Sequence, residues 1–280
     1  MGDYLRPTRL HDALTELERG EFLIIAGGTD IFPACVGRPI DKDVLDISGI
    51  SAIRGIVEED ECWNFGAAST WSDVISADLP DYFHYLQLAA REVGGKQIQN
   101  VGTVGGNVCN ASPAADGVPA LIALGARVRI SSVGKNRGMP VEEFIKGNRA
   151  TILAMNEVLS GFEIPKPMHS ARSNFYKIGA RAYLVISISM VAVVVEVDEN
   201  ETIKSARIVV GSCSAVAQRI AGLEELLVGL SISADMSDVV QTSHFQVLTP
   251  IDDVRGTADY RIETAVTAVR RSLAGLSEVH

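Results

Sequence analysis

The sequence predicts an α+β protein of two domains, and three observations support this prediction. The chain has 280 residues, of which 47% are hydrophobic, so it can bury a core large enough for two domains. Short apolar runs typical of strands alternate with amphipathic helical patterns. The segment around Pro165-Lys-Pro167 interrupts this pattern, and we take it as the boundary between residues 1–168 and residues 169–280.

The first domain is expected to be built from small units of helix and strand. Leu10, Ala13, Leu14 and Leu17 recur at helical spacing, and the apolar run at residues 22–25 follows as a buried strand. Further short strands are expected at residues 44–47, 53–57, 62–67 and 128–131, and helices at residues 70–77, 82–93 and 118–124. Residues 96–100 are expected to be a connection that leads into the centre of the chain.

The second domain is expected to combine an antiparallel sheet with helices. Strands are predicted at residues 175–178, 186–197 and 203–210, and the turn-like residues 198–201 indicate a hairpin between the last two. Residues 259–273 carry an apolar stripe at helical spacing, which predicts a helix packed on the core.

The most unusual stretch runs from Asn100 to Asp116 and contains Thr103-Val104-Gly105-Gly106-Asn107. The two glycines can take positive φ and let a ligand approach the backbone closely. Consecutive backbone N–H groups in such a turn form a concavity that binds anions. This stretch is therefore a candidate phosphate-binding loop.

A second stretch with the same chemistry lies upstream, where residues 22–25 lead into Ala26-Gly27-Gly28-Thr29-Asp30. Either glycine pair alone is more often a simple tight turn than a phosphate site. The two together, each flanked by short polar residues, predict the two halves of one pyrophosphate cradle.

Two charged residues complete the candidates drawn from the residues alone. Asp116 closes the central stretch, and Lys177 lies at the start of the second domain. The simpler interpretation makes Asp116 a helix cap and Lys177 a solvent-facing strand residue.

Composition excludes several classes of protein. A formal charge of -10 with no run of Lys or Arg argues against nucleic acid or an anionic membrane as the partner. The four cysteines are scattered and predict neither a zinc site nor an iron–sulfur cluster on this chain. The first residues do not have the pattern of a signal peptide, and no apolar run is long enough to span a membrane, so a cytoplasmic protein is expected.

Common catalytic and nucleotide motifs are also absent. The sequence contains no Gly-x-Gly-x-x-Gly, no phosphate loop of nucleoside triphosphatases, no Gly-x-Ser-x-Gly and no His-Glu-x-x-His, and its five histidines are isolated. We therefore expect the chemistry to belong to a bound cofactor, with no catalytic residue and no metal ligand on the chain itself.

Four segments in this order resemble a known family: residues 26–30, residues 97–107, Asn110-Ala-Ser-Pro-Ala-Ala-Asp116, and Tyr176-Lys-Ile-Gly-Ala-Arg181. They are similar to the FAD-binding medium subunits of molybdenum hydroxylases, the group that includes xanthine dehydrogenase and the carbon monoxide dehydrogenase flavoprotein. The resemblance implies an FAD-binding fold of the vanillyl-alcohol-oxidase (PCMH) type, with subdomains of about 1–56 and 57–168. A C-terminal flavoprotein domain of a small antiparallel sheet with helices would follow over residues 169–280.

The resemblance also implies roles for individual residues. Both glycine loops would hold the pyrophosphate of non-covalent FAD mainly through backbone N–H groups. Asn110 and Asp116 would lie near the ribose and adenosine, Val93 and Gly94 beside the cofactor, Leu159 against a ring face, and Lys177 near the isoalloxazine edge. The full set of implied cofactor-binding residues is Leu23, Ile24, Ile25, Ala26, Gly27, Gly28, Thr29, Asp30, Val93, Gly94, Thr103, Val104, Gly105, Gly106, Asn107, Asn110, Asp116, Leu159 and Lys177.

In such complexes a molybdopterin large subunit oxidises the substrate, and electrons pass through [2Fe-2S] clusters on a small subunit to the flavin. The resemblance implies that this chain is the flavin subunit, most simply in a dimer of heterotrimers, with an external acceptor such as NAD. Two alternatives stay open: a stand-alone FAD-dependent oxidase or reductase, and a flavin-free scaffold subunit.

Overall fold

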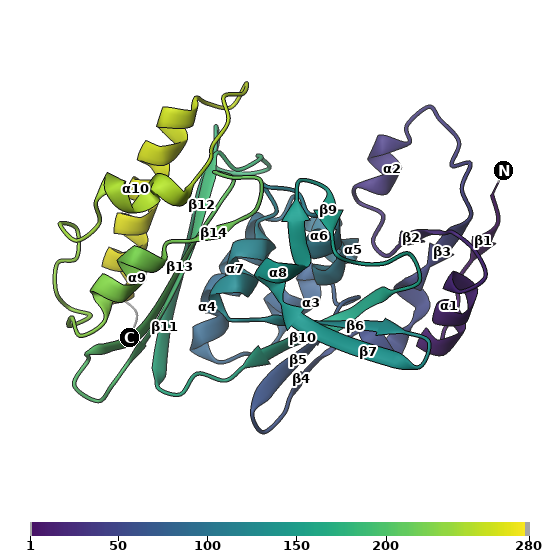
Figure 1. The fold of residues 1–280 in the computed structure, drawn as a ribbon, viewed down its shortest axis with the longest axis horizontal. Helices are drawn as coiled ribbons and strands as arrows, with labels where there is room; N and C mark the ends of the chain where they lie inside the picture. The colour runs from purple at the N-terminus through teal and green to yellow at the C-terminus, as the bar shows by residue number, and fades with distance from the viewer. Residues whose placement is uncertain (1, 278–280) are drawn as a thin grey trace.

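The computed structural model describes residues 2–277, which form two small and two larger β-sheets with helices between and around them (Figure 1). In chain order the elements, with 3-10 helices marked η, are β1 (Tyr4–Leu5), α1 (Leu10–Leu17), β2 (Leu23–Ile25), α2 (Ile31–Ala34), β3 (Val44–Asp46), η1 (Ile47–Gly49), η2 (Ser51–Ile53), β4 (Ile56–Glu58), β5 (Cys62–Gly66), α3 (Trp71–Ser76), η3 (Asp81–Phe83), α4 (His84–Glu92), α5 (Lys96–Val101), α6 (Val104–Asn110), α7 (Gly117–Ala123), β6 (Arg127–Ser132), β7 (Lys135–Pro140), α8 (Val141–Phe144), β8 (Ile145–Gly147), β9 (Ala150–Thr151), β10 (Val158–Pro165), β11 (Ser170–Ile178), β12 (Ser189–Val197), β13 (Ile203–Gly211), β14 (Gln218–Arg219), α9 (Ala221–Leu227), η4 (Thr242–Val247), α10 (Ala258–Ala274) and η5 (Gly275–Ser277).

The N-terminal part is a small parallel sheet in the order β1-β3-β2, which lies at the right of Figure 1. Its core includes Ala13, Leu14 and Leu17 of α1, which are buried as their helical spacing predicts. Strand β2 ends at Ile25, so the first glycine loop leaves the sheet at this edge. The sheet therefore fixes where that loop begins.

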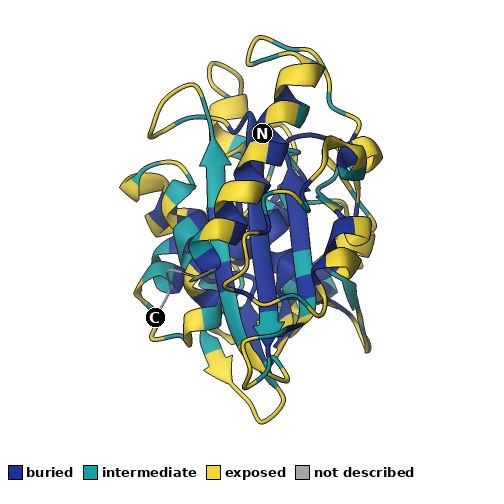
Figure 2. Cartoon of the chain, turned by 90° about the vertical axis from the view of Figure 1, so that its left-hand side faces the viewer, coloured by how far each residue is buried: buried dark blue, intermediate teal, exposed yellow. Residues whose placement is uncertain are grey.

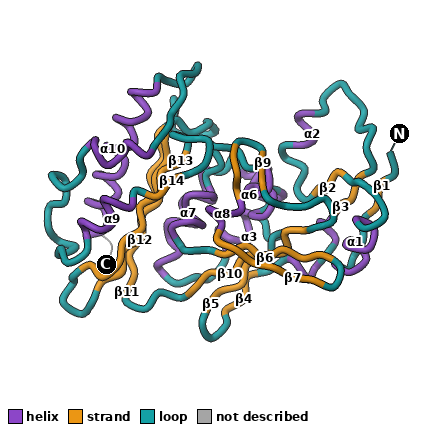
Figure 3. The backbone as a smooth tube through the Cα atoms, viewed as in Figure 1, coloured by secondary structure: helices purple, strands orange, loops and turns teal. Residues whose placement is uncertain are grey.

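The middle part is an antiparallel sheet in the order β4-β5-β10-β6-β7, with helices α3 to α8 beside it (Figure 3). Phe162 of β10 lies opposite both Phe65 of β5 and Val128 of β6, and all three side chains are buried. The same core takes in Trp71 of α3. Thr70 caps α3 as expected, because its side chain accepts the N–H of Asp73 in a capping box.

The C-terminal part is an antiparallel sheet in the order β11-β12-β13-β14 between two layers of helices. Helices α4 and α7 pack on one face, and α9 and α10 pack on the other. Figure 2 shows the strands as dark blue, buried ribbons behind helices whose outer turns are yellow. Strand β12 is an almost unbroken apolar run because both of its faces are covered.

Two expectations for the glycine-rich centre of the chain were wrong. Residues 96–100 are not a simple connection, since they belong to helix α5. Gly105 and Gly106 are not in a turn with positive φ, because they lie in the first turn of α6, which Thr103 caps by accepting the N–H of Gly106. A strong cap compensates here for the low helix propensity of the glycines.

No helix in the described part of the chain is both long and apolar enough to cross a lipid bilayer.

Candidate functional site

A cavity of about 340 Å³ lies between the loop that follows β2 and the first turns of α6. Its size is within the range of small-molecule sites. The predicted residues that line it are Ile24, Ala26, Gly27, Gly28, Thr29, Asp30, Val93, Thr103, Gly106, Asn107 and Asn110. The structure thus brings the two glycine stretches together, as the sequence predicts.

Gly27 allows the first glycine stretch to pack directly against the end of α5, because it has no side chain. A Cβ at this position would lie 2.0 Å from the carbonyl oxygen of Val101, so any side chain would separate the loop from the end of α5. Gly28 has φ +68°, a left-handed conformation that favours glycine. Both glycines of the first loop are therefore required by the backbone geometry.

The first loop presents free backbone donors. Within the described part of the chain, the N–H groups of Gly27, Gly28, Thr29 and Asp30 donate no hydrogen bond to another residue. Successive unpaired N–H groups at a left-handed glycine form a concavity that suits phosphate oxygens. This loop fits one half of a diphosphate cradle.

The second stretch contributes in a different way from the prediction. The N–H groups of Val104 and Gly105 donate to the carbonyl oxygens of Ser69 and Ala67, at 2.9 and 2.8 Å. The N–H of Gly106 donates to Thr103 Oγ1 at 2.9 Å. The backbone donors of this stretch are thus already used within the protein, so it cannot act mainly through backbone N–H groups.

Gly106 instead provides space. The residue is exposed and lines the cavity, and a Cβ there would meet only Thr103 Oγ1, at 2.8 Å. A Cβ on Gly105 would lie 2.7 Å from both Cβ and the carbonyl oxygen of Ala67. Gly105 therefore lets helix α6 pack closely against Ala67, the residue after β5, whereas Gly106 leaves space in the cavity because it has no side chain.

Asp116 and Lys177 form a buried ion pair outside this cavity. Lys177 Nζ lies 2.8 Å from Asp116 Oδ2, and Ser187 Oγ donates to Asp116 Oδ1 at 2.6 Å. Burial raises the pKa of Asp116, and the Lys177 ammonium and the hydrogen bonds oppose that rise. Neither simple interpretation holds, because Asp116 makes no side-chain cap and Lys177 does not face solvent.

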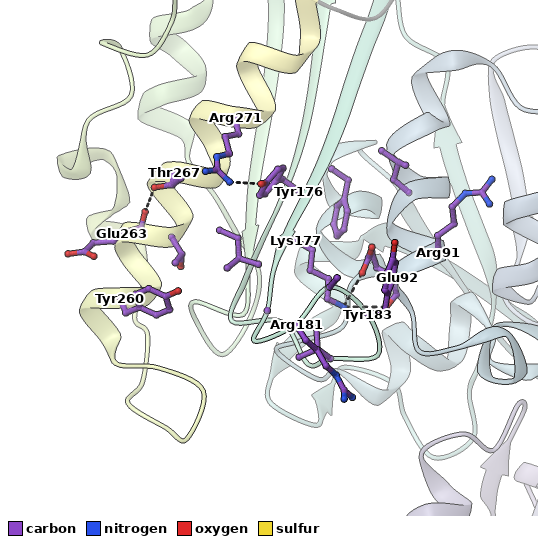
Figure 4. A pocket seen from close by; sticks show the side chains of 17 residues that line it. Arg91, Glu92, Tyr176, Lys177, Arg181, Tyr183, Tyr260, Glu263, Thr267 and Arg271 are labelled. Atoms are coloured by element: carbon purple, nitrogen blue, oxygen red, sulfur yellow. Dashed lines mark hydrogen bonds and ion pairs between the residues drawn. The ribbon is translucent and has the colours of Figure 1, made fainter.

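The contact brings together two residues to which the resemblance gave different roles, Asp116 on the ribose and adenosine side and Lys177 near the isoalloxazine edge. Lys177 also donates to the carbonyl oxygen of Glu92 at the end of α4, within a larger cavity of about 800 Å³ (Figure 4). That cavity contains no other predicted residue and lacks the first loop's free donors.

The remaining predicted residues do not line the cavity. Gly94 ends α4 with φ +55°, and Leu159 is buried in the core on β10. Leu23, Ile25, Val104 and Gly105 belong to elements that carry the lining residues. Sequence reasoning missed the lining residues Ile31, Trp71, Ile98, Gly102 and Cys109. Gly102 and Cys109 lie inside the stretch from Asn100 to Asp116, and Ile98 lies just before it, but the sequence did not single out any of the three.

Among the described residues that line the cleft, Asp30 is the one acidic side chain and there is no His, Lys or Arg. Burial raises the pKa of the Cys109 thiol to about 12, so it is protonated and unreactive at neutral pH. Among the described residues no three His, Cys, Asp or Glu side chains gather into a metal site. A cleft with free N–H donors and glycine walls but without a nucleophile defines a protein that binds an anionic, nucleotide-type cofactor.

Comparison with known proteins identifies which cofactor. Residues 1–167 match the family described as the FAD binding domain in molybdopterin dehydrogenase, and residues 174–276 match the CO dehydrogenase flavoprotein C-terminal domain. The chain therefore belongs to the family of FAD-binding subunits of molybdenum hydroxylases, which are oxidoreductases. FAD as the cofactor, the family and the two-part fold are confirmed predictions.

Individual relatives agree with this assignment. The nicotinate dehydrogenase FAD-subunit of Eubacterium barkeri is 32% identical over 217 residues, which cover 76% of this chain and 73% of the relative. The carbon monoxide dehydrogenase medium chain of Hydrogenophaga pseudoflava is 26% identical over 275 residues, covering 97% and 95%. A solved structure of the carbon monoxide dehydrogenase from that organism, lacking the Mo-pyranopterin moiety, matches with a TM-score of 0.90 at 25% identity, covering 99% of this chain and 97% of that one.

Proposed function

We propose that this chain is the electron-transfer subunit of a heteromeric molybdenum hydroxylase. It receives electrons from the [2Fe-2S] clusters of a small subunit and passes them to an external acceptor, while a large subunit with the molybdopterin cofactor oxidises the substrate. The observation that carries the proposal is the cleft, which offers a diphosphate cradle and no catalytic side chain. The relatives named as medium chains or FAD-subunits support the partner subunits.

The chain's own residues bind and orient the cofactor. FAD, when bound, supplies the reversible acceptance of electrons. The N–H groups of residues 27–30 hold the diphosphate, and Gly106 allows it to approach α6. Val93 and Ile24 give the cleft apolar walls. The proposal keeps all the residues implied by the sequence, although Asp116 and Lys177 lie outside the cavity and Gly94 and Leu159 do not line it.

We assign residues 1–168 to the FAD-binding domain, with subdomains of about 1–56 and 57–168, and residues 169–280 to the C-terminal flavoprotein domain. The ranges of the two family matches support this division. A dimer of heterotrimers and NAD as acceptor belong to the same proposal, and both rest on the resemblance to xanthine dehydrogenase.

Two other functions make different predictions. A stand-alone flavoprotein oxidase needs a base at the flavin, and the described cleft lining offers only Asp30, which is more than half exposed, and no His, Lys or Glu. A flavin-free scaffold would not need a cleft with free backbone donors, whereas Gly28 gives the first loop its left-handed turn and Gly106 leaves space in the cleft.

The test is to purify a tagged chain twice, once alone and once from cells that also make its partner subunits. The chain alone is expected to be yellow, to release FAD on acid treatment and to contain no iron. The complex is expected to contain iron and molybdenum as well, and its flavin should be reduced through the partners. A colourless chain that refuses added FAD favours the scaffold, and substrate oxidation by the chain alone favours the oxidase.

A further inference from the structure

The described lining of the cofactor cleft offers no positively charged side chain to a diphosphate. Its lining includes one acidic side chain, Asp30, and no Lys, Arg or His among the described residues. The chain as a whole has a formal charge of -10. The diphosphate of FAD adds further negative charge, and unpaired backbone N–H groups supply only partial positive charge. A cationic side chain close to the lining would therefore complement the diphosphate more fully than the backbone N–H groups alone.

Arg149 is in position to supply this positive charge. This residue lies in the turn between β8 and β9, and its Nη1 donates to Asn110 Oδ1 and lies 3.8 Å from Asp30 Oδ1. Both partners line the cavity, and they stand on opposite walls of it, one on α6 and one on the loop after β2. Arg149 therefore spans the mouth of the cleft beside the free N–H groups of residues 27–30.

The backbone at this point is strained, which sets Arg149 apart from an ordinary surface arginine. Its φ is +59°, and its N–H donates to the carbonyl oxygen of Ala111, a residue that is itself left-handed with φ +47°. Glycine would adopt either conformation without strain. The hydrogen bond between these two residues therefore fixes the backbone of Arg149 beside the cleft.

The ion pair with Asp30 does not explain the strain. Both side chains are more than half exposed, at 59% and 52%, and exposed pairs contribute little to stability. The Arg149 side chain is exposed enough to bind a second, more strongly charged partner as well. Guanidinium groups bind phosphate oxygens with paired, charge-assisted hydrogen bonds.

We propose that Arg149 is a cofactor-binding residue whose guanidinium supplies the positive charge for the diphosphate of FAD, opposite the N–H groups of residues 27–30. The inference rests on the proposed function, since it takes FAD as the occupant of the cleft. Asn110 holds the guanidinium in place, and Asp30 is the carboxylate that it screens from the diphosphate.

The experiment measures the affinity of the full-length chain, stripped of flavin, for FAD and for riboflavin, which lacks phosphate. The variants are Arg149→Gln, Arg149→Gly and, as a matched control, Lys146→Gln, an exposed residue of the same hairpin. Arg149→Gly suits the left-handed backbone, so it removes the side chain without a folding penalty.

Both Arg149 variants are expected to weaken FAD binding by roughly 10- to 100-fold, the range for losing a hydrogen bond to a charged group. Riboflavin binding should stay unchanged, and Lys146→Gln should behave as the wild type with both ligands. Salt should weaken FAD binding to the wild type more than to the variants.

Unchanged FAD affinity in both variants, or an equal loss for FAD and riboflavin, would overturn the inference. A wild-type chain that binds no FAD would contradict the proposed function itself, so the two failures are distinguishable.

Discussion

The ion pair of Lys177 and Asp116 ties the last third of the chain to the cofactor-binding part. Side-chain exposures are 6% for Lys177 and 9% for Asp116, so both charges have lost most of their hydration. Lys177 lies near the end of β11, Asp116 precedes α7, and Ser187 reaches Asp116 from the loop before β12. Such a pair contributes little compared with an apolar replacement, but a single charge left behind is costly.

We therefore predict that Lys177→Met lowers the free energy of unfolding by about 3–5 kcal/mol, because it leaves the Asp116 carboxylate buried without its cation. The double variant Lys177→Met with Asp116→Asn should recover much of that loss. Chemical denaturation of the three proteins measures both values. If the single and double variants lose the same stability, the pair is not coupled in the way its geometry indicates.

Only some of the residues with important contacts could be predicted from the sequence. Asp116 and Lys177 stood out because of their neighbours, yet a contact between residues so far apart in the chain leaves no spacing pattern. Arg149 had no signal at all, since a left-handed arginine looks like any other loop residue. Arg261 was equally hidden: it lies within the apolar stripe of α10, is 2% exposed, and donates to the carbonyl oxygens of Ile188 and Ser212.

Helix α6 shows how two adjacent glycines in one element serve different purposes. Gly105 faces Ala67 and lets the helix pack against the chain after β5, whereas Gly106 faces the cofactor cleft. The helix begins with a strong cap at Thr103, so it tolerates both glycines. Of two adjacent glycines, the first thus allows close packing and the second allows a ligand to approach.

The two glycines should therefore respond oppositely to substitution. Gly106→Val is expected to abolish FAD retention while costing about 1 kcal/mol of stability, since the new side chain fills the cleft and only disturbs the Thr103 cap. Gly105→Val should instead destabilise the fold, because its Cβ meets the backbone of Ala67. Flavin content and thermal unfolding distinguish the two effects. Full flavin occupancy in a folded Gly106→Val protein would remove this position from the cleft.

At the scale of elements, strands and long helices were predictable and the two short helices at residues 96–110 were not. Helices α1 and α10 followed from apolar periodicity, and β12 followed from its apolar run. Helices α5 and α6 are too short to show a periodic pattern, and the glycines of α6 favour a turn, so tertiary contacts stabilise these helices.

The molecule as a whole has a core that crosses the boundary between its two family-defined parts. Met190 and Val194 of β12 belong to the same buried cluster as Trp71 and Tyr85 of the N-terminal part. Val193, one residue away on the same strand, points into the other cluster, with α9 and α10. The sheet β11-β12-β13-β14 thus contributes to two cores, one on each of its faces. The sequence pattern separated these cores at residues 165–167, because periodicity identifies apolar faces but not the elements that pack against them.

This shared core predicts that the two parts unfold together. Both tryptophans, Trp63 and Trp71, lie in the N-terminal part, so their fluorescence reports that part alone. Val193→Ala removes buried apolar volume only on the face toward α10, and should cost about 2 kcal/mol. If the parts are coupled, this variant lowers the unfolding midpoint reported by the tryptophans as much as Val194→Ala does.

Val194→Ala is the matched comparison, because it makes the same change on the face that packs against the N-terminal part. Hydrogen exchange at β12 supplies the second reporter, and its opening free energy should equal that of the fluorescence transition in each protein. If Val193→Ala leaves the tryptophan unfolding midpoint unchanged but lowers the opening free energy of β12, the two parts are independent folding units. If the tryptophan midpoint and the opening free energy of β12 instead change together, packing on the α10 face of the sheet contributes to the stability of the cofactor-binding part.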